Sequence, residues 1–279
     1  MTARNAYAAL SEYKAYVVAR GQTSSTDATD DEVINNLLEQ ASRYIDDETG
    51  RAFYPFIQAR VYSAPNSLEL CVYEDLLEVI TLTNGDDVLI AASNYVLETA
   101  NNTPYWKLRL RSTSTTYWLP DSANGEEQVI ELRGWYGYRE SYSQRAWKVA
   151  GTLGAAITDT TTLAFTMSAG HTLTAGHIIK IDSEIYNVNT VVTNTITPLA
   201  RGDNGSTAVT HLNGATVYVW QPEPSAKQAA LEVANSAYMR RFGRNTGESA
   251  TVTAAGVVLT PQDIPATAKM FISRYKRMV

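Results

Sequence analysis

Residues 29–55, TDDEVINNLLEQASRYIDDETGRAFYP, contain the clearest structural signal in the chain: an amphipathic helix with a marked beginning and end. Thr29 and Glu32 fit a capping box, in which the two side chains accept hydrogen bonds from backbone N–H groups of the first turn. Apolar residues recur at spacings of three and four and predict one apolar stripe: Val33, Ile34, Leu37, Leu38, Ala41, Tyr44 and Ile45. Gly50 suits a left-handed C-cap. The pattern therefore predicts a helix over about residues 30–49.

Length and composition fit a globular protein. The chain has 279 residues, enough for one large or two medium domains, and its 44% hydrophobic and 19% charged residues exclude global disorder. No apolar run approaches the roughly 18 residues of a membrane-spanning helix. Glu12 and Lys14 interrupt the N-terminal stretch, so we expect no signal peptide. The single cysteine, Cys71, lies in an alternating apolar run, which predicts a small buried side chain in a protein made in a reducing cytoplasm.

Charge is unevenly distributed along the chain. The formal net charge is −6, yet the first 150 residues are acidic and residues 223–279 are basic. The basic residues of this last part are Arg240, Arg241, Arg244, Lys269, Arg274, Lys276 and Arg277, with Lys227 before them. We interpret them as solvated helix faces, because no block is long enough for a basic arm. The alternative is an end that meets an acidic partner or nucleic acid.

The apolar period changes twice along the chain. Residues 1–57 have a helical pattern. Residues 58–138 alternate as antiparallel strands do, at Gln58–Tyr62, Leu68–Val72, Val79–Leu82, Tyr95–Leu97, Trp106–Leu110 and Gln128–Trp135. Residues 146–221 are rich in Thr, Gly, Asn and Val and have many turn residues, which predicts a separate small β-sandwich or barrel whose two ends lie close together.

After this insert the pattern becomes helical again. Pro224 fits a first turn, and the small residues that follow predict a helix that packs closely on the helix at 30–49 and ends at Gly243. A β-like stretch, Thr251–Leu259, and a last helix at about 261–278 follow. The predicted fold class is α+β: a helical-bundle core with antiparallel strands (residues 1–145 and 222–279) and an inserted small all-β domain (residues 146–221).

Motifs for chemistry are absent. The sequence has no P-loop, GxGxxG, GxSxG, HExxH or CxxC pattern. All three histidines lie in the insert, and the nearest carboxylates, Asp182 and Glu184, have no characteristic spacing to them. We therefore expect no catalytic residue, no metal site and no cofactor. Arg201-Gly202-Asp203 is a known adhesion tripeptide, but Gly202 to Gly205 fits a tight turn better.

Several short motifs follow one another in a fixed order. They are a short helix at 8–17, the acidic start of the long helix, TGRAFYP at 49–55, NYVLE at 94–98, GWYGY at 134–138 and PSAKQAAL at 224–231. In this order they resemble the head–tail connector proteins (adaptor or head-completion proteins) of long-tailed double-stranded DNA phages. The resemblance covers residues 1–140 and 222–245. Family members pass almost directly from the G-x-Y-G-Y strand to the Ala-rich helix, whereas here the insert intervenes and resembles small β modules of phage virion proteins.

The resemblance implies a structural virion protein and no enzyme. The chain would form a closed homo-oligomeric ring, dodecameric in adaptors of this type, that is assembled in the host cytoplasm at the head–tail interface and touches no membrane. Its partners would be other copies of itself, the portal protein, a tail or stopper protein, and DNA that passes through the channel without sequence-specific binding. The alternative is a virion protein whose β insert binds a glycan or receptor.

Two groups of residues follow from these motifs. The family-motif core consists of Gly50, Arg51, Phe53, Pro55, Gly134, Trp135, Gly137 and Tyr138. A basic amphipathic helix near the end of the chain is suited to docking in a groove on a partner, which by resemblance would be the portal ring. The docking residues would be Lys269, Met270, Phe271, Arg274, Tyr275, Lys276 and Arg277.

Overall fold

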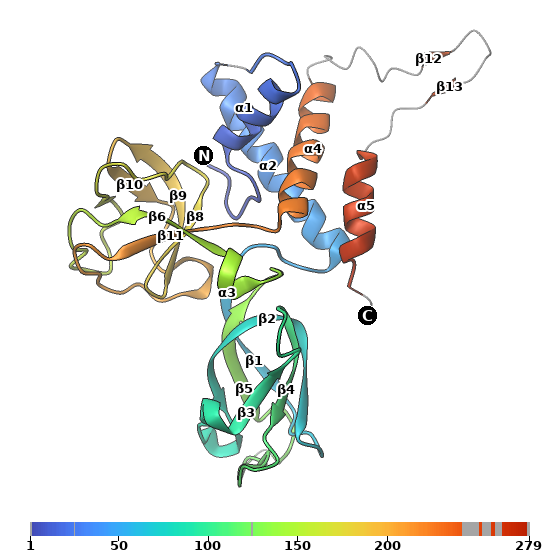
Figure 1. Ribbon diagram of the computed structural model, residues 1–279, viewed down its shortest axis with the longest axis vertical. Coiled ribbons are helices and arrows are strands. Elements are labelled where there is room, and N and C mark those ends of the chain that lie inside the picture. Colours follow the sequence, from blue (N-terminus) through green and yellow to red (C-terminus); the bar gives the residue numbers. More distant parts are fainter. Residues whose placement is uncertain are drawn as a thin grey trace.

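The computed structural model describes residues 2–24, 26–123, 125–241, 251–252, 258–259 and 264–277. Three parts meet near the middle of the molecule: a layer of helices, a five-stranded antiparallel sheet and a separate six-stranded antiparallel sheet (Figure 1). The predicted helical-bundle core is therefore wrong, because two sheets dominate the architecture and the helices form only one part. Helical periodicity is a strong local signal, whereas strand pairing joins residues far apart, so periodicity overstates the helical share.

The helical layer contains α1 (Leu10–Ala19), α2 (Ala28–Thr49), α4 (Pro224–Arg241) and α5 (Ala266–Tyr275). α2 begins earlier than predicted, because Asp27 is its N-cap and accepts the Thr29 N–H at 2.8 Å, so the capping box at Thr29 is wrong. The left-handed C-cap at Gly50 is confirmed by its φ of 65°. α4 packs on α2 and α5 through small buried alanines. Its predicted end at Gly243 lies outside the described residues.

The five-stranded sheet has the order β1-β5-β2-β4-β3. Its strands are β1 (Phe56–Tyr62), β2 (Glu69–Thr83), β3 (Tyr95–Glu98), β4 (Tyr105–Leu110) and β5 (Ile130–Tyr136), and short 3-10 turns lie at η1 (Gly85–Asp87) and η2 (Ala92–Asn94). The two strands predicted at 68–72 and 79–82 are one long strand, whose first part pairs with β4 and whose second part pairs with β5. Cys71 is exposed on β2, so its predicted burial is wrong.

A short helix, α3 (Tyr142–Arg145), leads into the insert. Its strands are β6 (Trp147–Thr152), β7 (Phe165–Thr166), β8 (Ile178–Ile181), β9 (Glu184–Val192), β10 (Thr195–Pro198) and β11 (Thr216–Trp220), with a 3-10 turn at η3 (Asp203–Gly205). The order is β6-β11-β8-β9-β10-β7, and a bridge between Leu153 and Met167 closes the sheet on itself. Trp147 and Trp220 lie opposite each other in β6 and β11, which confirms that the two ends of the insert are close together.

The insert is packed firmly on the rest of the molecule. Ile178, Ile185 and Trp220 share a buried core with residues of the five-stranded sheet and α3: Ile57, Leu77, Trp135, Tyr142 and Ala146. The turn η3 lies against β1 so closely that a Cβ on Gly205 would stand 2.0 Å from the Ile57 carbonyl oxygen. Two short strands, β12 (Thr251–Val252) and β13 (Val258–Leu259), pair with each other. Within the described ranges, no helix has the length and apolar character to cross a membrane.

Candidate functional site

The family-motif residues meet where α2 ends, β1 begins, β5 ends and α5 ends; we call this place the junction. Gly50 lets the chain turn out of α2, and Arg51 follows at once. The Arg51 Nε donates to the Tyr275 carbonyl oxygen at 2.7 Å, and its guanidinium lies 4.9 Å from the centre of the Tyr138 ring. Arg51 therefore links the end of α2 to α5 and to the chain after β5.

Asp75 in β2 forms ion pairs with two arginines at the junction. Its carboxylate is paired with Arg51, and its other oxygen lies 2.8 Å from an Nη of Arg277, just after α5. Burial raises the pKa of Asp75, and the guanidiniums of Arg51 and Arg277 oppose that rise. The three side chains tie the helical layer to the five-stranded sheet.

Phe53 is the centre of the aromatic packing at the junction. It is fully buried, and its ring lies 5.4 Å from Tyr138, 5.3 Å from Phe271 and 5.9 Å from Tyr275, measured between ring centres. The Trp220 indole N–H donates to its carbonyl oxygen at 3.1 Å. Phe53 thus joins α2, α5, the chain after β5 and the insert in one cluster.

Tyr7 anchors the N-terminal segment to the same cluster. Its hydroxyl accepts the Phe53 N–H at 2.9 Å and donates to the carboxylate of Asp46. Its ring meets that of Phe53 edge-on, with ring centres 5.7 Å apart. The segment before α1 is therefore part of the junction.

The glycines of the GWYGY motif allow close backbone approach. A Cβ on Gly137 would lie 2.4 Å from the Tyr54 carbonyl oxygen, and its φ of 131° already favours glycine. A Cβ on Gly134 would lie 2.5 Å from the Glu78 carbonyl oxygen. Between them, Trp135 packs into the core that the sheet shares with the insert. The Pro55 carbonyl oxygen accepts from the Asn204 amide at 2.9 Å, so all eight motif residues help to position the junction or its contact with the insert.

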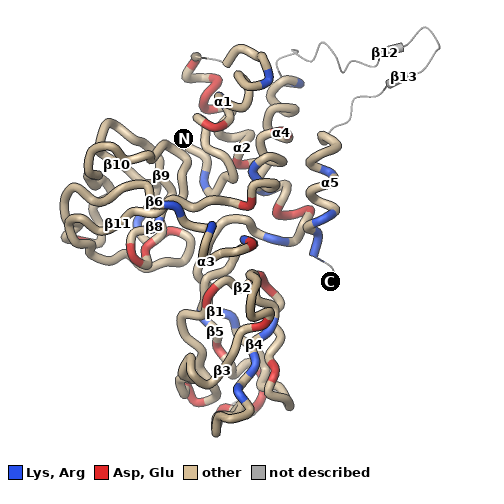
Figure 2. The backbone as a smooth tube through the Cα atoms, viewed as in Figure 1, with Lys and Arg blue, Asp and Glu red and all other residues tan. Residues whose placement is uncertain are grey.

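The residues of the predicted docking helix divide into two sets. Phe271 and Tyr275 are buried at the junction, and Arg277 is paired with Asp75. The exposed residues are Lys269, Met270, Arg274 and Lys276, and the Met270 side chain is 72% exposed. Figure 2 shows the basic residues near the end of α5. Only these four residues remain available to a partner.

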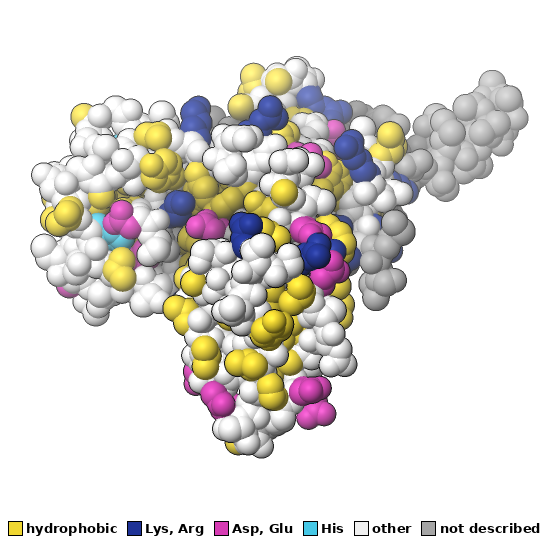
Figure 3. Space-filling view, turned by 60° about the horizontal axis from the view of Figure 1, so that its bottom comes forward, with side chains coloured by type: hydrophobic (Ala, Val, Ile, Leu, Met, Phe, Trp, Pro, Cys, Tyr) yellow, Lys and Arg dark blue, Asp and Glu magenta, His cyan; other side chains and the backbone are white. Residues whose placement is uncertain are grey.

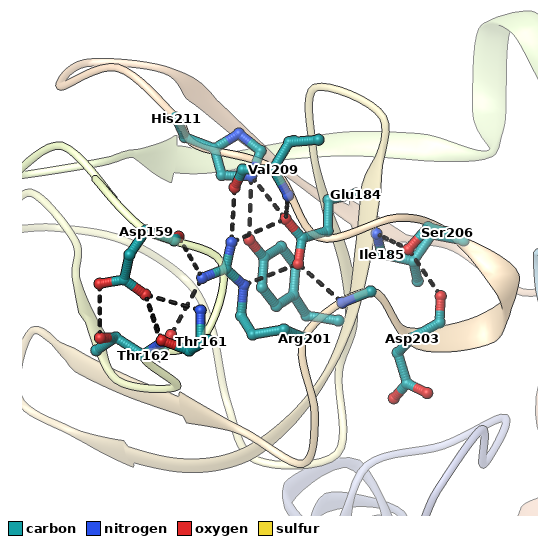
Figure 4. Close-up of polar contacts among 12 residues, drawn as sticks. Asp159, Thr161, Thr162, Glu184, Ile185, Arg201, Asp203, Ser206, Val209 and His211 are labelled. Atoms are coloured by element: carbon teal, nitrogen blue, oxygen red, sulfur yellow. Dashed lines mark hydrogen bonds and ion pairs between the residues drawn. The ribbon is translucent and has the colours of Figure 1, made fainter.

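The insert holds a buried ionic network (Figure 4). Glu184 is fully buried and accepts the Arg201 Nε and the Gly202 N–H, each at 2.8 Å, the Val209 N–H at 2.9 Å and a His211 contact at 3.1 Å. Burial acts to raise the pKa of Glu184, but hydrogen bonds from Arg201, the two backbone N–H groups and His211 outweigh it and lower the pKa to about 2. The carboxylate is held in its charged form.

Arg201 and His211 make the remaining hydrogen bonds of this network. Arg201 also donates to the carbonyl oxygens of Asp159, Thr162 and Val209, at 3.0, 3.1 and 2.6 Å. The His211 Nδ1 lies 2.7 Å from the Asp182 carboxylate. The network therefore stabilises the insert and offers no reactive group of the kind that acid–base or nucleophilic catalysis needs.

One histidine of the insert lies beside the two carboxylates to which its spacing in the sequence showed no relation. His211 meets both Asp182 and Glu184, while His171 and His177 lie elsewhere in the insert. Nowhere in the described ranges do three His, Cys, Asp or Glu side chains form a group able to hold a metal ion. The 3-10 turn η3, with Gly202 at a φ of 61°, confirms the predicted turn at 202–205. The side chains of Arg201 and Asp203 are buried in ion pairs, so this tripeptide is not an exposed adhesion loop.

Several important residues gave no signal in the sequence. Asp75 and Tyr7 belong to no motif, yet both hold the junction together. Aromatic residues at the entry to the insert are also internal: Tyr136 and Tyr142 are buried, and Trp147 meets the Trp220 ring with centres 5.0 Å apart. Outward-facing aromatic residues lie instead on the five-stranded sheet at Tyr73 and Trp106, and Figure 3 shows hydrophobic side chains on the surface of this part.

The sequence matches no protein-family model, and no curated protein matches it.

Proposed function

We propose that the protein is a structural virion component that forms a closed ring between the portal vertex of a phage head and the tail, and continues the DNA channel. One observation supports this most directly. Motif residues from 50–55 and 134–138 contact one another and the C-terminal helix at a single junction. These residues turn the chain after α2, let backbone segments approach closely and form an aromatic core. Such roles suit a subunit that holds the helical layer, the five-stranded sheet and the insert in fixed positions.

A ring requires two different faces on each subunit and a fixed angle between them. The junction supports such a fixed angle, because its ion pairs and aromatic contacts connect the helical layer to the five-stranded sheet. The insert is fixed as well, through the core that it shares with Ile57 and Trp135. A rigid subunit lowers the entropy that assembly costs.

The exposed face of α5 is the proposed contact with the portal. Lys269, Met270 and Arg274 are exposed on α5, and Lys276 is exposed directly after it, so this end of the chain combines positive charge with one exposed apolar side chain. The net charge of −6 suits a channel wall along which DNA slides, since neutralised phosphates are what hold DNA to protein. Other copies of the chain and a tail or stopper protein would complete the assembly.

Binding of a glycan or receptor through the insert has less support. The charged residues at the centre of the insert, Glu184 and Arg201, are buried and bonded to each other. The Asp203 side chain is likewise turned inward, toward Arg4 and Asn187. These residues build the insert and present nothing for a sugar or a receptor.

Electron microscopy tests the ring. Purified protein is imaged alone, with isolated portal rings, and with portal-bearing, DNA-filled heads. We expect ordered rings on the portal and the gain of tails only when the protein is present. A Lys269→Glu/Arg274→Glu variant tests the proposed docking face, and we expect it to bind the portal more weakly than the unmodified protein. Heads that gain tails equally well without the protein would contradict the proposal.

A further inference from the structure

The insert is held to the rest of the subunit on two chemically different sides. Toward the five-stranded sheet, the contact is an apolar core to which the insert contributes Ile178, Ile185 and Trp220. Toward the helical layer, the contact is polar and is made largely by the N-terminal segment, residues 2–9, which also bonds to α2. The polar partners of this segment on the insert are Asn187, Asn189, Asp203 and Asn204. A change in charge can therefore act on one side of the insert and not on the other.

His177 lies on this polar side of the insert, directly before β8. The neighbouring Gly176 contacts the N-terminal segment, since a Cβ added there would lie 3.4 Å from the Ala9 Cα. A small cavity of about 30 Å³ beside His177 is lined by residues of the N-terminal segment, α1 and α4, among them Tyr7, Glu12 and Lys227. The loop that carries His177 is therefore part of the contact between the insert and the helical layer.

The hydrogen bonds of the His177 ring require its neutral form. Its Nδ1 accepts the Thr174 N–H at 3.2 Å, and its Nε2 lies 3.2 Å from the Thr174 hydroxyl oxygen. A ring nitrogen that accepts a hydrogen bond carries no proton, so the single proton of the ring is on Nε2 and is donated to that hydroxyl. Ser11 of α1 donates to the same hydroxyl at 3.3 Å. The neutral ring thus holds the loop in the shape that meets α1.

The groups around His177 oppose a second proton on its ring. Burial lowers the pKa of His177 below its ordinary 6.5, Glu12 opposes this shift, and Lys227 adds to it. Glu12 and Lys227 form an ion pair with each other, so the carboxylate is already engaged and cannot fully neutralise an imidazolium. Tyr7 completes the titratable groups that line the cavity beside the ring.

We propose that His177 is a pH switch in the contact between the insert and the helical layer, and that protonation of its ring loosens the insert from α1 and the N-terminal segment. A proton taken up from solvent at Nδ1 removes the acceptor of the Thr174 N–H and places a positive charge beside Lys227. The apolar core that the insert shares with the sheet contains no group that titrates between pH 5 and 8. The insert therefore stays attached to the sheet at Trp220 while its other side is released. This inference does not depend on the proposed ring.

The direction of the response follows from the two states of His177. In the released state the ring is solvated and has its ordinary pKa of 6.5, whereas in the closed contact its pKa is lower. The released state therefore binds the proton first as the pH falls. The contact is at full strength above about pH 6.5 and weakens as the pH falls toward the lowered pKa. Each unit between the two pKa values changes the ratio of released to closed molecules about tenfold.

Hydrogen exchange of the full chain, measured at about pH 7.5 and about pH 5, tests the switch. After correction for the intrinsic effect of pH on exchange, we expect residues 2–13 and 174–179 to exchange about tenfold faster at the lower pH, while β5 and β11 stay protected. His177→Gln is neutral at both pH values and should lose this response. His171→Gln removes a histidine that bonds to Thr193 within the insert, and as the matched control it should keep the response.

A second variant and a direct titration keep the test decisive if His177→Gln folds poorly. Lys227→Gln removes the neighbouring cation and frees Glu12, so the pKa of His177 should rise and the exchange response should move to higher pH. The pKa of the His177 ring in the unmodified protein, measured by NMR, should lie below 6.5. A ring pKa at or above 6.5, a response that persists in His177→Gln, or a midpoint that stays the same in Lys227→Gln would each overturn the inference. Equally fast exchange in β11 would also overturn it, because acid would then be opening the whole insert.

Discussion

The insert and the junction solve the same problem, the burial of charged groups, in opposite ways. In the insert, the partners Glu184 and Arg201 are 17 residues apart and belong to one closed sheet. At the junction, Asp75 takes one arginine 24 residues away and another 202 residues away. The Glu184–Arg201 pair is therefore satisfied within the insert alone, whereas the ion pairs of Asp75 form only when segments from far apart in the chain are in place.

This difference predicts how damage spreads through the molecule. A broken contact in the insert should loosen the insert and leave the helices in place. A broken contact at the junction should loosen helices and sheet together, because the same side chains serve several elements. Substitutions with matched controls can separate these two responses.

The largest effect is expected from Phe53→Ala. The substitution removes a fully buried ring that contacts four aromatic neighbours, and we expect a loss of about 3–5 kcal/mol in the free energy of unfolding. Denaturant titration followed by circular dichroism should show helix and sheet lost in one shifted transition. Tyr73→Ala, at a residue that is 75% exposed, is the control and should change stability by about 0.5 kcal/mol or less. A normal midpoint for Phe53→Ala would show that the junction is not a shared core.

Glu184→Gln should cost less and act locally. Arg201 would lose its buried counter-charge, which typically costs about 3 kcal/mol. We expect the insert to unfold before the helices, seen as hydrogen exchange that rises in residues 147–220 while α2 stays protected. Asp182→Asn, whose side chain is 63% exposed, should have a much smaller effect. Equal loss of protection in α2 would contradict local damage.

The same carboxylate gives a pH dependence with a definite sign. The pKa of Glu184 falls from its ordinary 4.5 to about 2 in the folded protein. Its contribution to stability is therefore fully present above about pH 4.5 and is lost as the pH falls toward 2. The difference in stability between the native protein and Glu184→Gln should narrow over that range.

Local features of the fold could be predicted from the sequence, and long-range ones could not. The stripe at 33–45 and Gly50 mark α2 because helix contacts repeat every three or four residues. Its N-cap was misplaced because Asp27 and Thr29 are both good capping residues and only geometry chooses between them. The start of β8 and the close ends of the insert also followed from local alternation and turn residues.

Only part of the candidate site could be predicted from the sequence, for the same reason. The motif residues were identifiable, but nothing near Asp75 in the sequence indicates that Arg51 and Arg277 will meet there. The stripe on α5 was visible, yet its apolar residues could equally have faced a partner. The structure shows that Phe271 and Tyr275 face their own subunit, because their rings pack against the ring of Phe53.

Asp75→Asn should have a moderate effect on the whole junction, because Asp75 in β2 holds both Arg51 after α2 and Arg277 after α5. The amide keeps the shape but loses the charge that Arg51 and Arg277 share, and such a charged hydrogen bond is worth about 1–3 kcal/mol. We expect α5 to loosen first, with faster hydrogen exchange in residues 266–275. Glu131→Gln, an exposed carboxylate on β5, is the control. Unchanged exchange in α5 would show that Phe271 and Tyr275 alone hold the helix.

The smallest effect on the folded subunit should come from Lys269→Glu with Arg274→Glu. Both side chains are exposed on α5, so stability should change by about 0.5 kcal/mol or less. Portal binding should weaken, and its dependence on salt should fall, because exposed charges are screened within about 10 Å at 0.1 M ionic strength. Lys148→Glu, an exposed cation in β6, keeps the change in charge away from α5 and should leave portal binding intact. If the α5 variant binds the portal normally, the exposed face of α5 is not the docking surface, and α5 serves only the junction.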